Sequence, residues 1–139
     1  MSLTNLRPYL RSVMNSLGYS EWTDGFNWEN IPSTIIDGTY HLEVQENSSA
    51  KQNQYDIEIE IPVVIRLFTK GFRDPASGID DMISKIEGII KEACKPTASL
   101  GSLVSCKFRT MAVEPFIVSN DNLIMGRIEF SNILILAPN

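Results

Sequence analysis

The clearest hydrophobic pattern along the chain is the alternation in residues 55–68, YDIEIEIPVVIRLF. Every odd position of this stretch is apolar, whereas the even positions begin with three acidic residues and then reach Pro62. A period of two predicts a β-strand with one face turned toward a core. Because proline cannot donate a ladder hydrogen bond, Pro62 predicts an edge position, a bulge or a bend that divides the strand into parts 55–61 and 63–68.

Two other stretches carry apolar residues at helical spacing. Residues 3–17 place them along one side of a predicted amphipathic helix, and Gly18 follows in a position that suits a left-handed helix end. Residues 79–93 form a stronger apolar stripe, with Ser77 placed to cap its start and Pro96 placed to end it. The pattern therefore predicts one helix near the N-terminus and one in the middle of the chain.

Shorter alternations predict the remaining strands, at residues 33–46, 103–111, 113–118 and 123–136. The polar residues 46–54 are expected to form a mobile hairpin loop. These elements predict a single α+β domain that spans residues 1–139. It contains a mainly antiparallel sheet of about five strands with two helices packed on it, in the order α-β-β-α-β-β-β.

The charge balance narrows the possible partners. Twelve basic and seventeen acidic residues give a net charge of −5, which argues against a protein that coats nucleic acid. It remains compatible with a protein through which nucleic acid passes. Cys94 and Cys106 are not a CxxC pair, so the chain is expected to be intracellular with reduced core cysteines, with a disulfide or a reactive thiol as the alternatives. No signal-peptide or membrane-spanning pattern is found, so cytoplasmic synthesis is expected.

The chain lacks the usual constellations of catalysis. His41 is its single histidine and lies on the polar face of a predicted strand, where a surface or interface role is expected. No serine lies in a nucleophile elbow, and no glycine-rich phosphate loop is present. One histidine and two distant cysteines make a poor zinc site. We therefore predict no catalytic residue, no metal site and no cofactor.

An acidic row is the most distinctive polar feature. Asp56, Glu58 and Glu60 project from one strand face at a spacing of about 6.6 Å, twice the strand rise. That spacing exceeds the ~5–5.5 Å of a retaining glycosidase pair and lies at the short end of the inverting range. The row is therefore a solvated face, a subunit or lumen surface, or less readily a hydrolase site. Lys107 and Arg109 could pair with it within one chain or across a subunit boundary.

Aromatic residues gather in residues 19–32, before the first long predicted strand. Trp22, Phe26 and Trp28 lie in this turn-rich stretch. The loop either lays its aromatic side chains over the edge of the core or presents them to a partner protein, since exposed tryptophans often anchor interfaces.

The whole layout resembles the tail terminator proteins of long-tailed bacteriophages, which are also called minor tail or tail completion proteins. The resemblance lies in element order, chain size and the texture of three segments: NIPSTIIDGTYHLEV, YDIEIEIPVVIRLF and the closing EPFIVSNDNLIMGRIEFSNILIL. No catalytic or ligand motif is matched, so no site residue is carried over from the family.

The resemblance implies a structural protein of the virion and no enzyme. Such proteins form a hexameric ring on the last ring of the tail tube, stop its polymerisation and offer a surface for head attachment. The implied partners are other copies of the chain, the tail tube protein and a head-side neck protein, while DNA passes without specific binding and no membrane is involved. The implied location is the host cytoplasm during assembly and then the head-proximal end of the tail. The alternative within the same setting is another head–tail connector or neck adaptor.

Overall fold

The alternating stretch forms the central strand of a sheet. In a computed structural model of the chain, this strand, β4, spans Ile57–Lys70. The structure describes residues 6–23, 29, 31–32, 34–44, 49–52, 57–70, 74–95, 103–118 and 121–136. The odd-numbered residues of β4 from Ile61 to Leu67 are buried, as the alternation predicts.

Within the described residues, six strands form one sheet. Besides β4 these are β1 (Ser20–Glu21), β2 (Thr39–Val44), β3 (Ser49–Gln52), β5 (Leu103–Val118) and β6 (Asp121–Leu136). Hydrogen bonding orders them β1-β2-β4-β6-β5, and β3 pairs with the part of β4 that lies beyond β2. β1 pairs in parallel with β2, whereas every other pair is antiparallel. The α+β class and the mainly antiparallel sheet are thus confirmed.

Pro62 lies where β4 changes neighbours on one side. β3 pairs with β4 as far as Glu60, and β2 begins its pairing at Val63. On the other side, β6 pairs with β4 without interruption, with Pro62 opposite Ser131. The missing N–H of the proline therefore falls at the junction between two neighbouring strands, and β4 continues through it unbroken.

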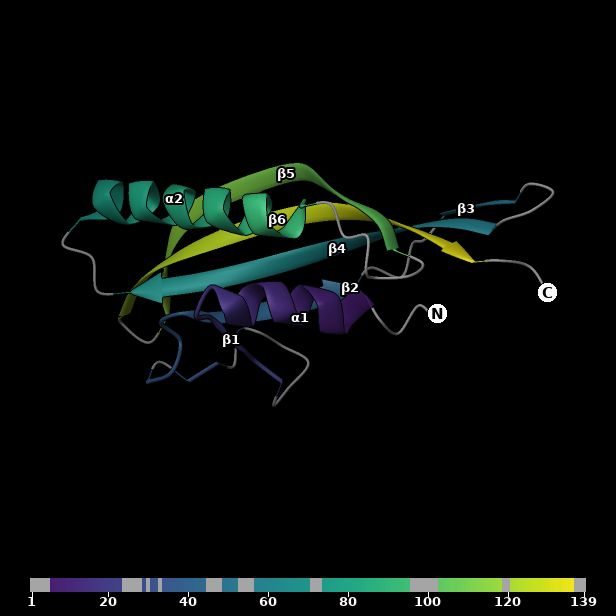
Figure 1. The fold of residues 1–139 in the computed structure, drawn as a ribbon. Helices are drawn as coiled ribbons and strands as arrows, with labels where there is room; N and C mark the ends of the chain where they lie inside the picture. Colours follow the sequence, from purple (N-terminus) through teal and green to yellow (C-terminus); the bar gives the residue numbers. More distant parts are fainter. Residues whose placement is uncertain are drawn as a thin grey trace.

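Two helices cover one face of this sheet. These are α1 (Leu6–Ser16) and α2 (Pro75–Ala93), whose fully buried residues share one core with the odd-numbered residues of β4. Figure 1 shows both helices along the sheet, while the end that carries β3 extends beyond them. The Tyr9 hydroxyl of α1 donates a 2.5 Å hydrogen bond to the Ala93 carbonyl at the end of α2, so the two helices are joined directly.

A second, smaller cluster covers the other face at one end of the sheet. Phe68 of β4 packs there with two residues of β6 and with two from the segment between β1 and β2: Leu123, Met125, Ile31 and Ile36. Phe68 is an even-numbered residue of β4, so its side chain lies on the face opposite the helices. The same face carries the charged residues described below.

Several predicted boundaries differ from the observed ones. Residues 49–52 form the short strand β3 inside the predicted loop 46–54, because they complete the ladder along the exposed edge of β4. The predicted strands 103–111 and 113–118 are one strand, β5, with a register shift between Phe108 and Thr110 that absorbs the change in alternation. The observed order among elements of four or more residues is therefore α-β-β-β-α-β-β.

The start of the central helix also differs from the prediction. Asp74 is its N-cap, and the Asp74 carboxylate accepts a 2.8 Å hydrogen bond from the backbone N–H of Ser77. Pro75 occupies the first turn, where its missing N–H costs nothing. Ser77 is therefore the capped donor of this helix and not its cap, and the helix begins three residues earlier than predicted.

Candidate assembly surface

The acidic row lies on the sheet face opposite the helices. Glu58 and Glu60 are half-buried on β4, whereas Asp56 lies outside the described residues. The Ser131 hydroxyl donates a 2.6 Å hydrogen bond to Glu60. Glu58 has Lys51 of β3 as its register partner, which the sequence alone could not reveal while residues 46–54 were expected to form a loop. The chain therefore provides a hydrogen-bond donor for the Glu60 carboxylate.

Lys107 and Arg109 lie on β5, which forms one edge of the sheet. Both side chains are exposed, and Lys107 is in register with Ser131. Arg109 is the extra residue at the register shift, so it has no partner on β6. Within the described residues, neither cation forms an ion pair, and neither contacts Glu58 or Glu60. Among the described residues, these cations therefore do not pair with the acidic row of the same chain.

A row of basic residues that was not predicted from the sequence crosses the middle of the same face. The ladder places His41 of β2, Arg66 of β4 and Arg127 of β6 side by side. Arg66 pairs with Glu43 at 2.7 Å, and Arg127 pairs with Glu129 at 3.7 Å. Arg66 could have been placed on this face from the sequence, because it is even-numbered like Glu58 and Glu60 of the same strand. Arg127 could not, because its position depends on the register between β4 and β6.

The environment of His41 favours its neutral form. Burial is the main cause that lowers its pKa below 6.5, and the positive charge of Arg66 acts in the same direction. The histidine therefore contributes to the packing of a charged sheet face. Its described neighbours do not form a catalytic triad with it.

The aromatic segment before β2 is only partly described. The Trp22 side chain is half-buried and packs on the small cluster around Phe68, and the Trp22 backbone N–H donates a 2.8 Å hydrogen bond to the Tyr40 carbonyl. This favours the interpretation in which the loop covers the edge of the core. Phe26 and Trp28 lie outside the described residues.

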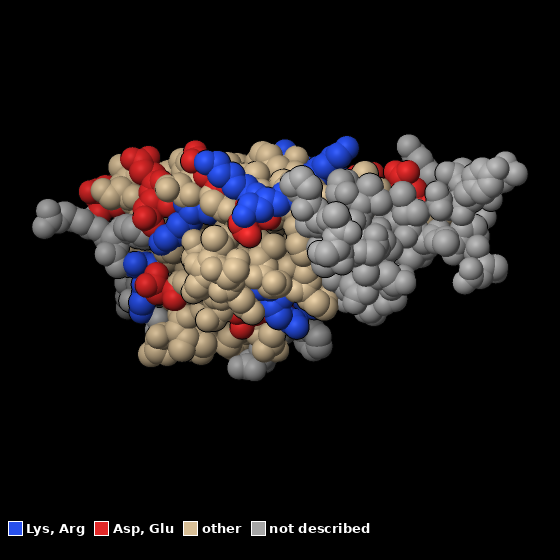
Figure 2. Space-filling view, viewed as in Figure 1, with Lys and Arg blue, Asp and Glu red and all other residues tan. Residues whose placement is uncertain are grey.

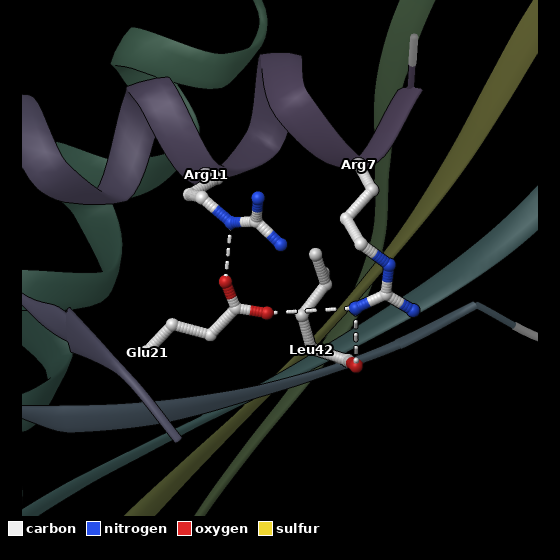
Figure 3. Close-up of polar contacts among 4 residues, drawn as sticks. All are labelled: Arg7, Arg11, Glu21 and Leu42. Carbon is white, nitrogen blue, oxygen red and sulfur yellow. Dashed lines mark hydrogen bonds and ion pairs between the residues drawn. The ribbon is translucent and has the colours of Figure 1, made fainter. Parts of the chain in front are cut away.

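The β2 edge of the sheet is closed by the chain itself. Three successive outward carbonyls accept hydrogen bonds from outside the β2–β4 ladder. Gly38 accepts from the Ser20 N–H at 3.0 Å, and Tyr40 accepts from the Trp22 N–H. Leu42 accepts from the Arg7 guanidinium at 3.3 Å, as Figure 3 shows. No acceptor in this run is left for another strand.

Glu21 holds the closing arginine in place. Its carboxylate contacts Arg11 at 2.5 Å and Arg7 at 3.5 Å, as drawn in Figure 3. The Glu21 side chain is only 8% exposed, whereas each arginine side chain is 42% exposed. The three residues tie α1 to β1, and they use up a positive charge that could otherwise bind an anion.

The β5 edge lies on the other side of the sheet. β5 spans sixteen residues and pairs with β6 alone among the described strands. Phe108 is 39% exposed and Met111 is 37% exposed, and both flank the cation Arg109. Half-exposed apolar residues beside unpaired cations along an open strand are typical of a protein interface.

The two cysteines are close to each other but differ in exposure. Cys94 is exposed at the end of α2, and Cys106 is buried on β5. Burial, with a smaller contribution from the Cys94 thiol, raises the pKa of Cys106 to about 12. The prediction of a core position is confirmed for Cys106 and is wrong for Cys94, which follows the last residue of α2 and is exposed.

Acidic residues also gather away from the sheet. Figure 2 shows them at the end of the molecule where α2 begins. Asp80 and Glu87 of that helix are exposed. Within the described part of the chain, no group of three or more potential metal ligands is found. These acids are best explained as a solvated helix surface.

The chain matches no protein-family model and shows no significant match to a curated protein. Among the described helices, none combines the length and the apolar character needed to cross a membrane.

Proposed function

We propose that this protein is a structural component of a bacteriophage tail, a tail terminator that assembles into a ring. The ring caps the tail tube, stops its polymerisation and presents a surface to which the filled head attaches. The proposal starts from the resemblance of the sequence to that family. The structural observation that carries it further is the open edge of β5.

An open edge of this length is a liability for a protein that works as a monomer. Unpaired N–H and C=O groups along an edge strand form a template for another strand, and exposed apolar side chains add affinity. β5 combines such an edge with Phe108 and Met111, whereas three outward carbonyls along the β2 edge of the same sheet already accept hydrogen bonds. In a protein that assembles, the open edge can bind a partner while the other edge stays blocked.

The charge of the chain suits a channel through which DNA passes. Lysines and arginines that neutralise phosphates generate most non-specific DNA affinity. With a net charge of −5, and with four of the five described arginines paired to carboxylates, the chain offers little such affinity. DNA would therefore slide through the ring without binding.

A tube-capping assay tests this function. A bacteriophage tail tube protein is polymerised with increasing amounts of the purified protein, and tube lengths are measured by negative-stain electron microscopy. We expect short tubes that carry a ring at one end. Tubes of unchanged length with bare ends would contradict the proposal, and binding to the portal complex without binding to tubes would indicate a head-side neck adaptor instead.

A further inference from the structure

The two cysteines of the chain meet where the end of α2 lies on the start of β5. Cys94 directly follows Ala93, the last residue of α2, and Ala93 shares the main buried core with Cys106 of β5. The thiols of Cys94 and Cys106 are close enough to share a hydrogen bond. The sequence contains no other cysteine, so these two thiols are the only possible partners for a disulfide within one chain.

The backbone at this junction is held in place. The Tyr9 hydroxyl of α1 donates its hydrogen bond to the Ala93 carbonyl, and the Tyr9 ring packs against the core that contains Cys106. The Cys94 backbone N–H donates a 3.0 Å hydrogen bond to the Ile90 carbonyl of α2. A disulfide bond is only about 2 Å long, so the sulfur atoms must approach each other. Rotation of the exposed Cys94 side chain can supply this movement without moving the helix.

The different exposure of the two thiols sets the order in which they react. Cys94 is exposed, so a dissolved reagent can reach its sulfur, whereas Cys106 is buried. The thiolate is the reactive form of cysteine, and burial, together with the Cys94 thiol, raises the pKa of Cys106 to about 12. Cys106 is therefore protected from reagents in solution, and the sulfur that it can attack is the one beside it, on Cys94.

We propose that Cys94 and Cys106 form a reversible disulfide that fastens the end of α2 to β5, with a low-molecular-weight disulfide such as oxidised glutathione as the oxidant. The Cys94 thiolate attacks one sulfur of oxidised glutathione, whose own disulfide bond breaks and releases one glutathione thiolate. Cys106 then loses its proton to water and attacks the Cys94 sulfur, which releases the second glutathione. Two cysteine thiols are oxidised, and one glutathione disulfide is reduced to two glutathione molecules.

The compartment decides the state of this bond. Cytoplasmic glutathione keeps thiols reduced, so the bond is open during synthesis and closes when the protein reaches an oxidising environment. It forms within one chain, so it goes beyond the proposed ring and does not depend on it. The open β5 edge stays accessible in both states, because Cys106 lies in the core that β5 shares with the helices.

Intact-mass measurement after treatment with oxidised glutathione tests the pairing. The natural protein is expected to lose two hydrogens and to carry no glutathione. Cys106→Ala is expected to keep one glutathione on Cys94, because no second thiol can displace it. Cys94→Ser is expected to stay unmodified, because its remaining thiol is buried. Circular dichroism first establishes that each variant is folded.

A displaced cysteine controls for exposure alone. Ser84 is an exposed residue of α2, ten residues before position 94 and therefore about 15 Å away along the helix. The variant with Cys94→Ser and Ser84→Cys again has one exposed and one buried thiol, and it should keep its glutathione. A disulfide in this control would show that the bond does not need the native junction and would overturn the proposal. So would a natural protein that stays unmodified, keeps glutathione on Cys94 or forms disulfide-linked dimers.

Thermal unfolding tests whether the native fold accommodates the bond. A cross-link between positions 94 and 106 restricts the unfolded chain, so the oxidised protein should unfold at a temperature roughly 5–10 °C above that of the reduced protein. A phosphine reductant should remove this difference and should leave Cys94→Ser and Cys106→Ala unchanged. Equal unfolding temperatures for the oxidised and reduced natural protein would contradict the fastening of α2 to β5.

Discussion

Glycine at position 126 determines how closely α2 approaches the sheet. It lies on β6, and a Cβ atom placed there would be 2.6 Å from the Met82 sulfur and 3.0 Å from the Ile86 Cδ1 atom. Both of these helix residues are fully buried. The glycine is therefore needed for the close approach of a helix to a strand, and its conformational freedom is not the reason.

Replacing Gly126 with alanine should destabilise the fold. The added methyl group forces Met82 and Ile86 to shift in a packed core, so we expect a loss of about 1–3 kcal/mol in the free energy of unfolding. Gly88→Ala is the matched control, because a Cβ atom at Gly88 of α2 has no neighbour within 4 Å. Helix propensity predicts that this control is neutral or stabilising by up to about 1 kcal/mol. Urea denaturation measures both, and an equally stable Gly126→Ala variant would contradict the packing described for α2.

His41 should make stability depend on pH. Burial and Arg66 lower its pKa in the folded protein below the unfolded value of 6.5, so the unfolded chain binds the proton more readily. The free energy of unfolding should therefore fall as the pH drops through about 6.5, and it should lose this component in His41→Gln. Urea midpoints measured between pH 7.5 and 5.5, about one unit either side of that value, test the sign. Parallel curves for the two proteins would show that the histidine has no such effect.

At the scale of elements, α1 contacts the sheet in two ways. Its apolar side packs on the sheet through Leu10 and Met14, and its polar side closes the β2 edge through Arg7. Glu21 links the second contact to β1 by pairing with Arg7 and Arg11. The helix thus prevents strand pairing on one side of the sheet, and growth of the sheet is left to the other edges.

Removing the charge of Glu21 tests this closure. In Glu21→Gln the arginines lose a carboxylate that is 8% exposed, so we expect a loss of about 1–3 kcal/mol in the free energy of unfolding, reduced by the exposure of the arginines. Glu87→Gln removes an exposed carboxylate of α2 and serves as the control. Amide exchange of β2 should also accelerate in the first variant only. Unchanged exchange would mean that Arg7 closes the edge without help from Glu21.

At the scale of the whole molecule, the fold class followed from short-range patterns, whereas the candidate surface required the register. The alternation of residues 55–68 predicted the central strand and its buried side correctly. Nothing local revealed that residues 49–52 pair with β4, or that Lys51 lies opposite Glu58, because a polar strand at an edge lacks an apolar signal. The row of His41, Arg66 and Arg127 was likewise invisible, since it joins residues far apart in the chain.

The same limit applies to the open β5 edge. Lys107 and Arg109 were found by their alternation, and their opposite charge to the acidic row suggested a contact. The bulge at Arg109 and the closure of the β2 edge are properties of the folded sheet. Because of these properties, Lys107 and Arg109 do not pair with the acids of the same chain and remain available to a neighbouring protein.

The oligomeric mass of the natural protein tests the central claim most directly. Light scattering after size exclusion, over a wide range of concentrations, should reveal one closed assembly whose mass stops growing. For the expected hexamer that mass is six times 15.6 kDa, or about 94 kDa. A protein that remains at the mass of one chain at every concentration, including with tail tubes present, would contradict the account.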